Sequence, residues 1–102
     1  MSWLLEFRPE VAQDVAEAAK WYESRETDLG GEFVEELIQV WERILENPFI
    51  GSRRHSKMDI RWRYPERFPY RVVYKVDEVD QFILVIAVIH AARQEKGWQA
   101  RV

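Results

Sequence analysis

The feature that most restricts the fold is an unbroken run of eight apolar residues, Phe82 to Ile89, near the end of a chain of 102 residues. The run is too short to cross a membrane as a helix, which takes about 20 residues. Its length and composition are typical of a strand that is covered on both faces, and such strands lie inside a sheet. The rest of the chain therefore has to provide neighbouring strands and a covering layer.

Alternating residue types predict those neighbouring strands. In residues 59–64 and 70–76, apolar or aromatic residues largely alternate with charged ones. Residues 77–80 are rich in acids and supply the turn to the apolar run. Three consecutive strands with short links favour an antiparallel meander. Residues 3–7 show the same alternation and predict a fourth strand of this sheet, since an isolated strand cannot pair its backbone groups.

Two helical segments separate the first strand from the other three. Each segment has a stripe of apolar residues with the spacing of an amphipathic helix. The first stripe contains Val11, Val15, Ala18 and Tyr22, and the second contains Leu29, Phe33, Leu37, Val40, Trp41 and Ile44. Pro9 suits the first turn of a helix, and Asn47-Pro48 ends the second. The link between them is short, with Thr27 or Asp28 as a helix cap, so the helices form an antiparallel pair.

These elements predict one α+β domain over residues 1–102. Its two layers are an antiparallel four-stranded sheet and an N-terminal antiparallel helix pair on one face, in the order β-α-α-β-β-β, with the other face open. Residues 91–97 suit a short C-terminal helix, and Trp98 then returns to the core. The composition is 47% hydrophobic, which excludes a disordered chain. The chain has no cysteine, which excludes disulfides, thiolate zinc sites and a cysteine nucleophile.

The charge of the chain is divided unevenly along its length. Residues 1–50 have a net charge of −8 and residues 51–102 a net charge of +5, although the whole chain has −3. Residues 51–75 alone have a net charge of +6. Such asymmetry favours a protein with one face that binds a polyanion. The alternative is a solvated surface of uneven charge. The N-terminus reaches the acid Glu6 too early for a signal peptide, so we expect a soluble cytoplasmic protein.

Period-two geometry predicts where the basic side chains gather. If the aromatic sides of the strands face the helices, four cations line the open face, and three more enter from the preceding loop. The strand cations are Arg61, Arg63, Arg71 and Lys75, and the loop cations are Arg53, Arg54 and Lys57. Guanidinium groups suit phosphate because they donate two parallel hydrogen bonds. The pattern predicts a nucleic-acid-binding face; the alternative is a set of ordinary exposed residues.

His90 ends the apolar run, and Arg93 follows three residues later, where a helical turn would aim both side chains at one place. An unperturbed histidine titrates near pH 6.5 and can transfer a proton at neutral pH. The alternative is a histidine at a strand end that bonds to the backbone. His55 lies far from His90 in the sequence and no compact cluster of ligands accompanies them, so we expect no metal and no cofactor.

Several short motifs follow one another along nearly the whole chain. They are Phe7-x-Pro9, Asp14-x-x-Glu17-Ala18-x-x-Trp21-Tyr22-Glu23, Leu29-Gly30-x-x-Phe33-x-x-Glu36, Arg43-Ile44-x-x-Asn47-Pro48, Ile60-Arg61, Phe68-Pro69-Tyr70-Arg71-Val72-x-Tyr74, and Ala87-Val88-x-His90-x-x-Arg93 with Trp98. In this order they resemble the RelE/ParE family of toxins from bacterial type II toxin–antitoxin systems. The resemblance implies a growth-arresting toxin that is neutralised by a cognate antitoxin in a hetero-oligomer.

The resemblance leaves two targets open. Some members of the family are metal-independent endoribonucleases that cut messenger RNA on the ribosome, and others poison DNA gyrase. For a nuclease, it implies that Arg61 and Arg71 stabilise phosphate charge and that His90 transfers a proton, with Arg93 beside it on the active face. The ending A-V-x-H-x-x-R is closer to the ParE-like branch, and Trp98 stands where the nucleases often have a tyrosine. Outside the family, a non-toxic binding module is the alternative.

Overall fold

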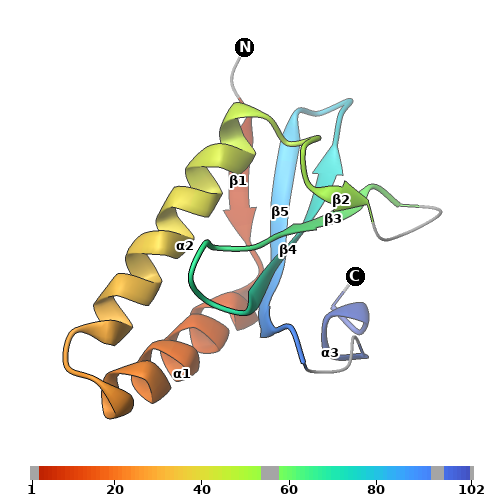
Figure 1. The fold of residues 1–102 in the computed structure, drawn as a ribbon. Helices are drawn as coiled ribbons and strands as arrows, with labels where there is room; N and C mark the ends of the chain where they lie inside the picture. Colours follow the sequence, from red (N-terminus) through yellow and green to blue (C-terminus); the bar gives the residue numbers. More distant parts are fainter. Residues whose placement is uncertain (1–2, 54–57, 93–95, 102) are drawn as a thin grey trace.

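The computed structural model describes residues 3–53, 58–92 and 96–101 (Figure 1). Along the chain the elements are β1 (Leu4–Phe7), α1 (Pro9–Arg25), α2 (Leu29–Glu46), β2 (Ser52–Arg53), β3 (Ile60–Arg63), β4 (Tyr70–Asp77), β5 (Phe82–His90) and α3 (Lys96–Gln99). The α+β class and the order of the predicted elements are confirmed. Within the described ranges, the structure contains no helix with the length and hydropathy of a membrane-spanning segment.

The sheet has the strand order β1-β5-β4-β3-β2, so the apolar run is an interior strand as predicted. The four predicted strands are all present, but the prediction that the sheet is purely antiparallel is wrong. β1 pairs with β5 in the parallel direction, and the two-residue β2 adds a fifth strand beside β3. Alternation of residue types predicts a strand but does not encode its direction relative to a distant strand, and two residues are too few to show alternation at all.

The helix pair covers one face of the sheet, as Figure 1 shows. The side chains between the two layers form the main core. They come from both helices, from every second residue of β4 and from Ile83, Val85 and Val88 of β5. The largest fully buried members include Phe33, Leu37, Ile44, Val72 and Tyr74. This core confirms the apolar stripes that the sequence predicts for both helices.

The opposite face of the sheet is not open, contrary to the prediction. It carries a second core of buried residues, namely Ile60, Trp62, Val73, Ile86, Ala87, Ile89 and Trp98. Trp98 belongs to α3 and is 1% exposed, and its ring centroid lies 6.4 Å from that of Trp62. The aromatic side of β3 therefore faces α3 and not the helix pair. Two large indoles bury more apolar area against each other than either would bury on an uncovered face.

The link between the helices is held by a side chain of α1. Asp28 is the N-cap of α2, but its backbone has a φ of 73° and its side chain makes no capping bond. The Glu23 carboxylate caps α2 instead, because it accepts hydrogen bonds from the backbone N–H groups of Asp28 and Gly30 at 2.9 Å and 3.0 Å. The helix start is thus fixed from the preceding helix.

The two adjacent glycines of α2 provide a matched pair of stability variants. A Cβ on Gly30 would lie 2.5 Å from the carbonyl oxygen of Ala19, whereas a Cβ on Gly31 meets nothing within 4 Å. Gly30→Ala is expected to destabilise the fold by about 1–3 kcal/mol, because the helices must separate. Gly31→Ala should stabilise it by up to about 1 kcal/mol, since alanine favours the helix. Urea denaturation measures both, and equal effects would contradict the close approach of the helices.

Candidate functional site

The predicted basic face is not formed, because its cations project from opposite sides of the sheet. Directly opposed residues of an antiparallel pair share a face. Arg61 pairs with Tyr74 and Arg63 with Val72, and both partners lie in the main core between sheet and helices. Arg71 pairs with Ile89 and Lys75 with Leu84, which places them on the side of the second core. The prediction that all four line one face is therefore wrong.

Arg61 fastens the connection from α2 to β2. Its side chain is 15% exposed, forms an ion pair with Asp59 at 2.7 Å and donates to the carbonyl oxygens of Phe49 and Gly51. The buried hydroxyl of Tyr74 donates to the carbonyl oxygen of Pro48 at 2.8 Å in the same region. Burial raises the pKa of this phenol. These contacts assign Arg61 a structural task that the sequence reading did not foresee.

Arg71 lies against an indole on the second face. The central carbon of its guanidinium is 4.1 Å from the ring centroid of Trp62, which is cation–π geometry. Lys75 is on the same face four residues along β4, and so roughly 13 Å away along the strand. Arg53 lies in β2, where it pairs with Arg61. Three predicted site residues, Arg54, Lys57 and Arg93, lie outside the described residues.

His90 projects from the opposite face to Arg71. Its register partner is Tyr70, whose ring centroid lies 5.2 Å away, and Tyr70 belongs to the main core. Nδ1 of His90 accepts a hydrogen bond from the backbone N–H of Ala92 at 3.0 Å. The alternative reading, a strand-end histidine bonded to backbone, is therefore confirmed. In neutral His90 this bond leaves the proton on Nε2.

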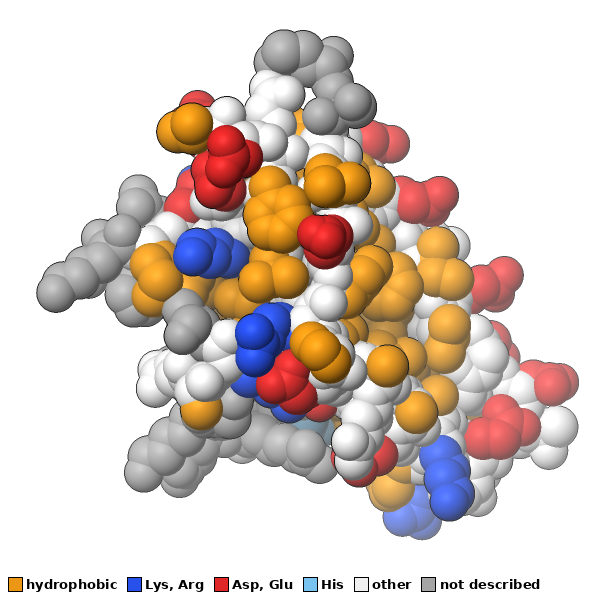
Figure 2. All heavy atoms as spheres, turned by 180° about the vertical axis from the view of Figure 1, so that it is seen from behind, with side chains coloured by type: hydrophobic (Ala, Val, Ile, Leu, Met, Phe, Trp, Pro, Cys, Tyr) orange, Lys and Arg blue, Asp and Glu red, His pale blue; other side chains and the backbone are white. Residues whose placement is uncertain are grey.

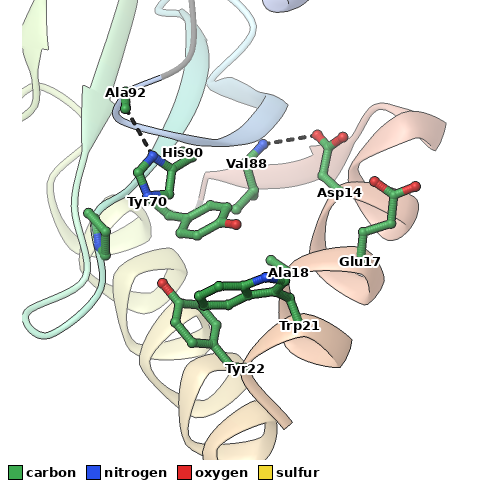
Figure 3. Close-up of a pocket in the computed structure, with 10 residues that line it drawn as sticks. Asp14, Glu17, Ala18, Trp21, Tyr22, Tyr70, Val88, His90 and Ala92 are labelled. Atoms are coloured by element: carbon green, nitrogen blue, oxygen red, sulfur yellow. Dashed lines mark hydrogen bonds between the residues drawn. The ribbon is translucent and has the colours of Figure 1, made fainter. Parts of the chain in front are cut away.

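A groove opens beside His90, between α1 and the adjoining ends of β4 and β5 (Figure 3). It has a volume of about 640 Å³ and is lined by Asp14, Glu17, Ala18, Trp21, Tyr22, Pro69, Tyr70, Val88, His90 and Ala92. Burial, and to a smaller extent the neighbouring Tyr70, raises the pKa of the Tyr22 phenol. Of these residues, His90 is a site residue predicted from the sequence, and Trp21, Tyr22 and Tyr70 are not.

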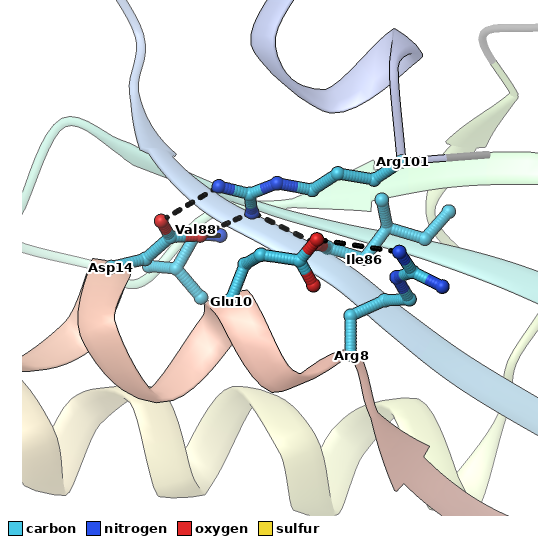
Figure 4. Close-up of polar contacts among 6 residues, drawn as sticks. All are labelled: Arg8, Glu10, Asp14, Ile86, Val88 and Arg101. Atoms are coloured by element: carbon cyan, nitrogen blue, oxygen red, sulfur yellow. Dashed lines mark hydrogen bonds and ion pairs between the residues drawn. The ribbon is translucent and has the colours of Figure 1, made fainter.

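A bidentate ion pair next to the groove joins the two ends of the domain (Figure 4). The guanidinium of Arg101 contacts both carboxylate oxygens of Asp14, at 2.6 Å and 3.0 Å, and donates to the carbonyl oxygen of Ile86. Asp14 also accepts the backbone N–H of Val88 at 3.1 Å. The hydrogen bonds from Arg101 to the Asp14 carboxylate raise the pKa of Arg101. Sequence reasoning missed the pair, although Asp14 has helical spacing with the stripe residues Val11 and Ala18.

An apolar surface runs across β1 and α2. Phe7, Ile38 and Leu45 are 42%, 44% and 36% exposed, Leu4 is 60% exposed, and the rings of Phe7 and Trp41 touch with centroids 4.8 Å apart. We call these five residues the β1–α2 surface. Figure 2 shows hydrophobic side chains gathered in the middle of the face seen from behind. β1 is also an outer strand of the sheet, so one of its backbone edges has no neighbouring strand among the described residues.

The fold is shared with solved toxin structures. The chain resembles a chromosomal ParDE toxin–antitoxin system from P. aeruginosa at 16% identity with a TM-score of 0.71, covering 86% of this chain and 95% of that one. It resembles the isolated E. coli RelE toxin at 24% identity with a TM-score of 0.67, covering 96% and 94%. An archaeal RelE–RelB complex from Pyrococcus horikoshii OT3 matches at 14% identity with a TM-score of 0.62, covering 92% of this chain and 100% of that one.

Sequence comparison gives the family. No curated protein matches the chain. The model of the ParE toxin of the type II toxin–antitoxin system parDE matches residues 5–95, which take in all of β1 but its first residue, the other described strands and both long helices. The chain therefore belongs to the ParE toxin family.

Proposed function

We propose that the protein is the toxin of a type II toxin–antitoxin pair, which arrests growth and is neutralised by a cognate antitoxin. The observation that carries the proposal is the family match over residues 5–95. The β1–α2 surface supports it, because apolar side chains with exposures of 36–60% beside an unpaired strand edge favour a protein partner. The antitoxin covers this surface and holds the toxin in a hetero-oligomer in the cytoplasm.

We further propose that the toxin acts by binding its target and not by cutting RNA, with DNA gyrase as that target. Phosphodiester cleavage needs an acid, a base and cations at one phosphate. Here Arg61 is committed to Asp59 and to two carbonyl groups, and Arg71 and His90 project from opposite faces. This separation supports a toxin that needs no general acid at His90.

Single substitutions at the two separated residues distinguish the mechanisms. We expect His90→Ala and Arg71→Ala to arrest growth nearly as strongly as the parent protein, because neither side chain takes part in a chemical step. A nuclease would lose roughly 100-fold or more in cleavage rate when its acid or its charge-stabilising group is removed. Transcript integrity and plasmid topology are examined in the same induced cells. Cut transcripts that disappear in both variants would instead support messenger RNA cleavage.

A further inference from the structure

The groove beside His90 is left unused by the proposed function. Trp21 and Tyr22 of α1 and Tyr70 of β4 form an almost continuous aromatic wall. The ring centroids of Trp21 and Tyr22 are 5.1 Å apart, and those of Tyr22 and Tyr70 are 6.0 Å apart. Trp21 is 51% exposed, which is a large fraction for an indole beside a concave surface. Figure 3 shows Trp21 and Tyr22 on the α1 side of the groove and Tyr70, Val88 and His90 on the side of the sheet.

The charge of the groove selects the kind of ligand. Its lining contains two carboxylates, Asp14 and Glu17, and no lysine or arginine among the described residues. Asp14 is already held by Arg101 through both oxygens. Glu17 is exposed and accepts a hydrogen bond from the side-chain amide of Gln13, which is itself exposed. Glu17 is thus the carboxylate that can receive a new cation.

The surroundings disfavour a polyanion. Eleven acids of the chain lie between residues 10 and 46, which span both long helices, and residues 1–50 have a net charge of −8. Phosphates of a nucleic acid would be repelled from α1, whereas a basic peptide would be attracted.

We propose that the groove binds an arginine side chain of a protein partner. A guanidinium stacks on aromatic rings through its flat face and pairs with a carboxylate through its fork, so it matches both parts of the groove. The same chain shows the preference: the guanidinium of Arg25 lies 4.6 Å from the ring centroid of Trp21. The identification of that partner as the antitoxin rests on the proposed function.

A titration of the purified protein tests the site without reference to growth. The probe is N-acetyl-arginine amide, and the neutral control is N-acetyl-citrulline amide, which has nearly the same shape. We expect saturable NMR shifts of the Trp21 indole N–H and the Val88 and Ala92 amides, with a dissociation constant on the order of 10 mM. Citrulline should bind at least about fivefold more weakly.

Three variants locate the contact. Glu17→Gln should weaken binding of the arginine probe about fivefold, and Glu42→Gln, an exposed acid on α2, should leave it unchanged. Arg25→Gln should tighten binding, because it removes a like charge from the Trp21 ring. Equal affinities for arginine and citrulline, no saturable shifts, or tighter binding of an RNA dinucleotide would each overturn the proposal. A failed titration would overturn the arginine site but not the toxin function. Absence of growth arrest would overturn the toxin function but not the arginine site, so the two proposals are tested separately.

Discussion

Replacing Asp14 with alanine is expected to lower the free energy of unfolding by about 3 kcal/mol. The change removes both carboxylate contacts to Arg101 and leaves a guanidinium with a 19% exposed side chain beside the sheet. It also leaves the backbone N–H of Val88 without its carboxylate acceptor. For a domain of about 100 residues the thermal midpoint should fall by roughly 12 °C or more. Circular dichroism against temperature and urea measures both quantities.

Glu10→Gln is the matched control, because it affects a similar pair on the same helix. Arg8 and Glu10 are 3.3 Å apart, with side chains 38% and 41% exposed, and exposed pairs contribute little to stability. The thermal midpoint of Glu10→Gln should stay close to that of the parent. If Asp14→Ala were as stable as this control, the C-terminal segment would not be fastened to α1 by the Asp14–Arg101 pair.

Replacing Ile38 with glutamate is expected to weaken antitoxin binding by about 100-fold or more while the toxin stays active. Ile38 is 44% exposed and lies one helical turn from Trp41 in the β1–α2 surface. Its side chain is not part of the main core, so the fold should persist, but a bound partner would have to bury the new carboxylate. Calorimetry with the purified cognate antitoxin measures the affinity.

Val79→Glu is the control for charge alone. Val79 is 92% exposed in the turn between β4 and β5 and is not one of the five residues of the β1–α2 surface. This variant should bind the antitoxin with the affinity of the parent protein and should be neutralised in cells. Full neutralisation of Ile38→Glu would show that the antitoxin covers another part of the toxin.

The elements that the sequence predicts well are those whose signal is local. The apolar run is the interior strand β5 because its residues need cover on both faces, and Pro9 and Asn47-Pro48 bracket the helix pair as their restricted backbone angles require. The sequence did not predict that β1 runs parallel to β5, because this pairing depends on the path of the whole chain between the two strands.

The candidate site was predicted less well, because its arrangement depends on which face of β3 is covered. Because successive side chains of a strand alternate, Arg61 and Trp62 must point to opposite faces of the sheet, but the alternation does not show which face meets the helix pair. That choice depends on Trp98, a residue 36 positions later that covers Trp62 from α3. The Asp14–Arg101 pair likewise joins residues 87 positions apart. Neither contact leaves a periodic signal in the sequence.

The toxin–antitoxin proposal is tested by the growth of cells that express the protein alone or together with its cognate antitoxin. We expect arrest when the protein is expressed alone and normal growth when both proteins are expressed. Unimpaired growth with folded protein accumulating in the cells, or arrest that no co-expressed partner relieves, would contradict it.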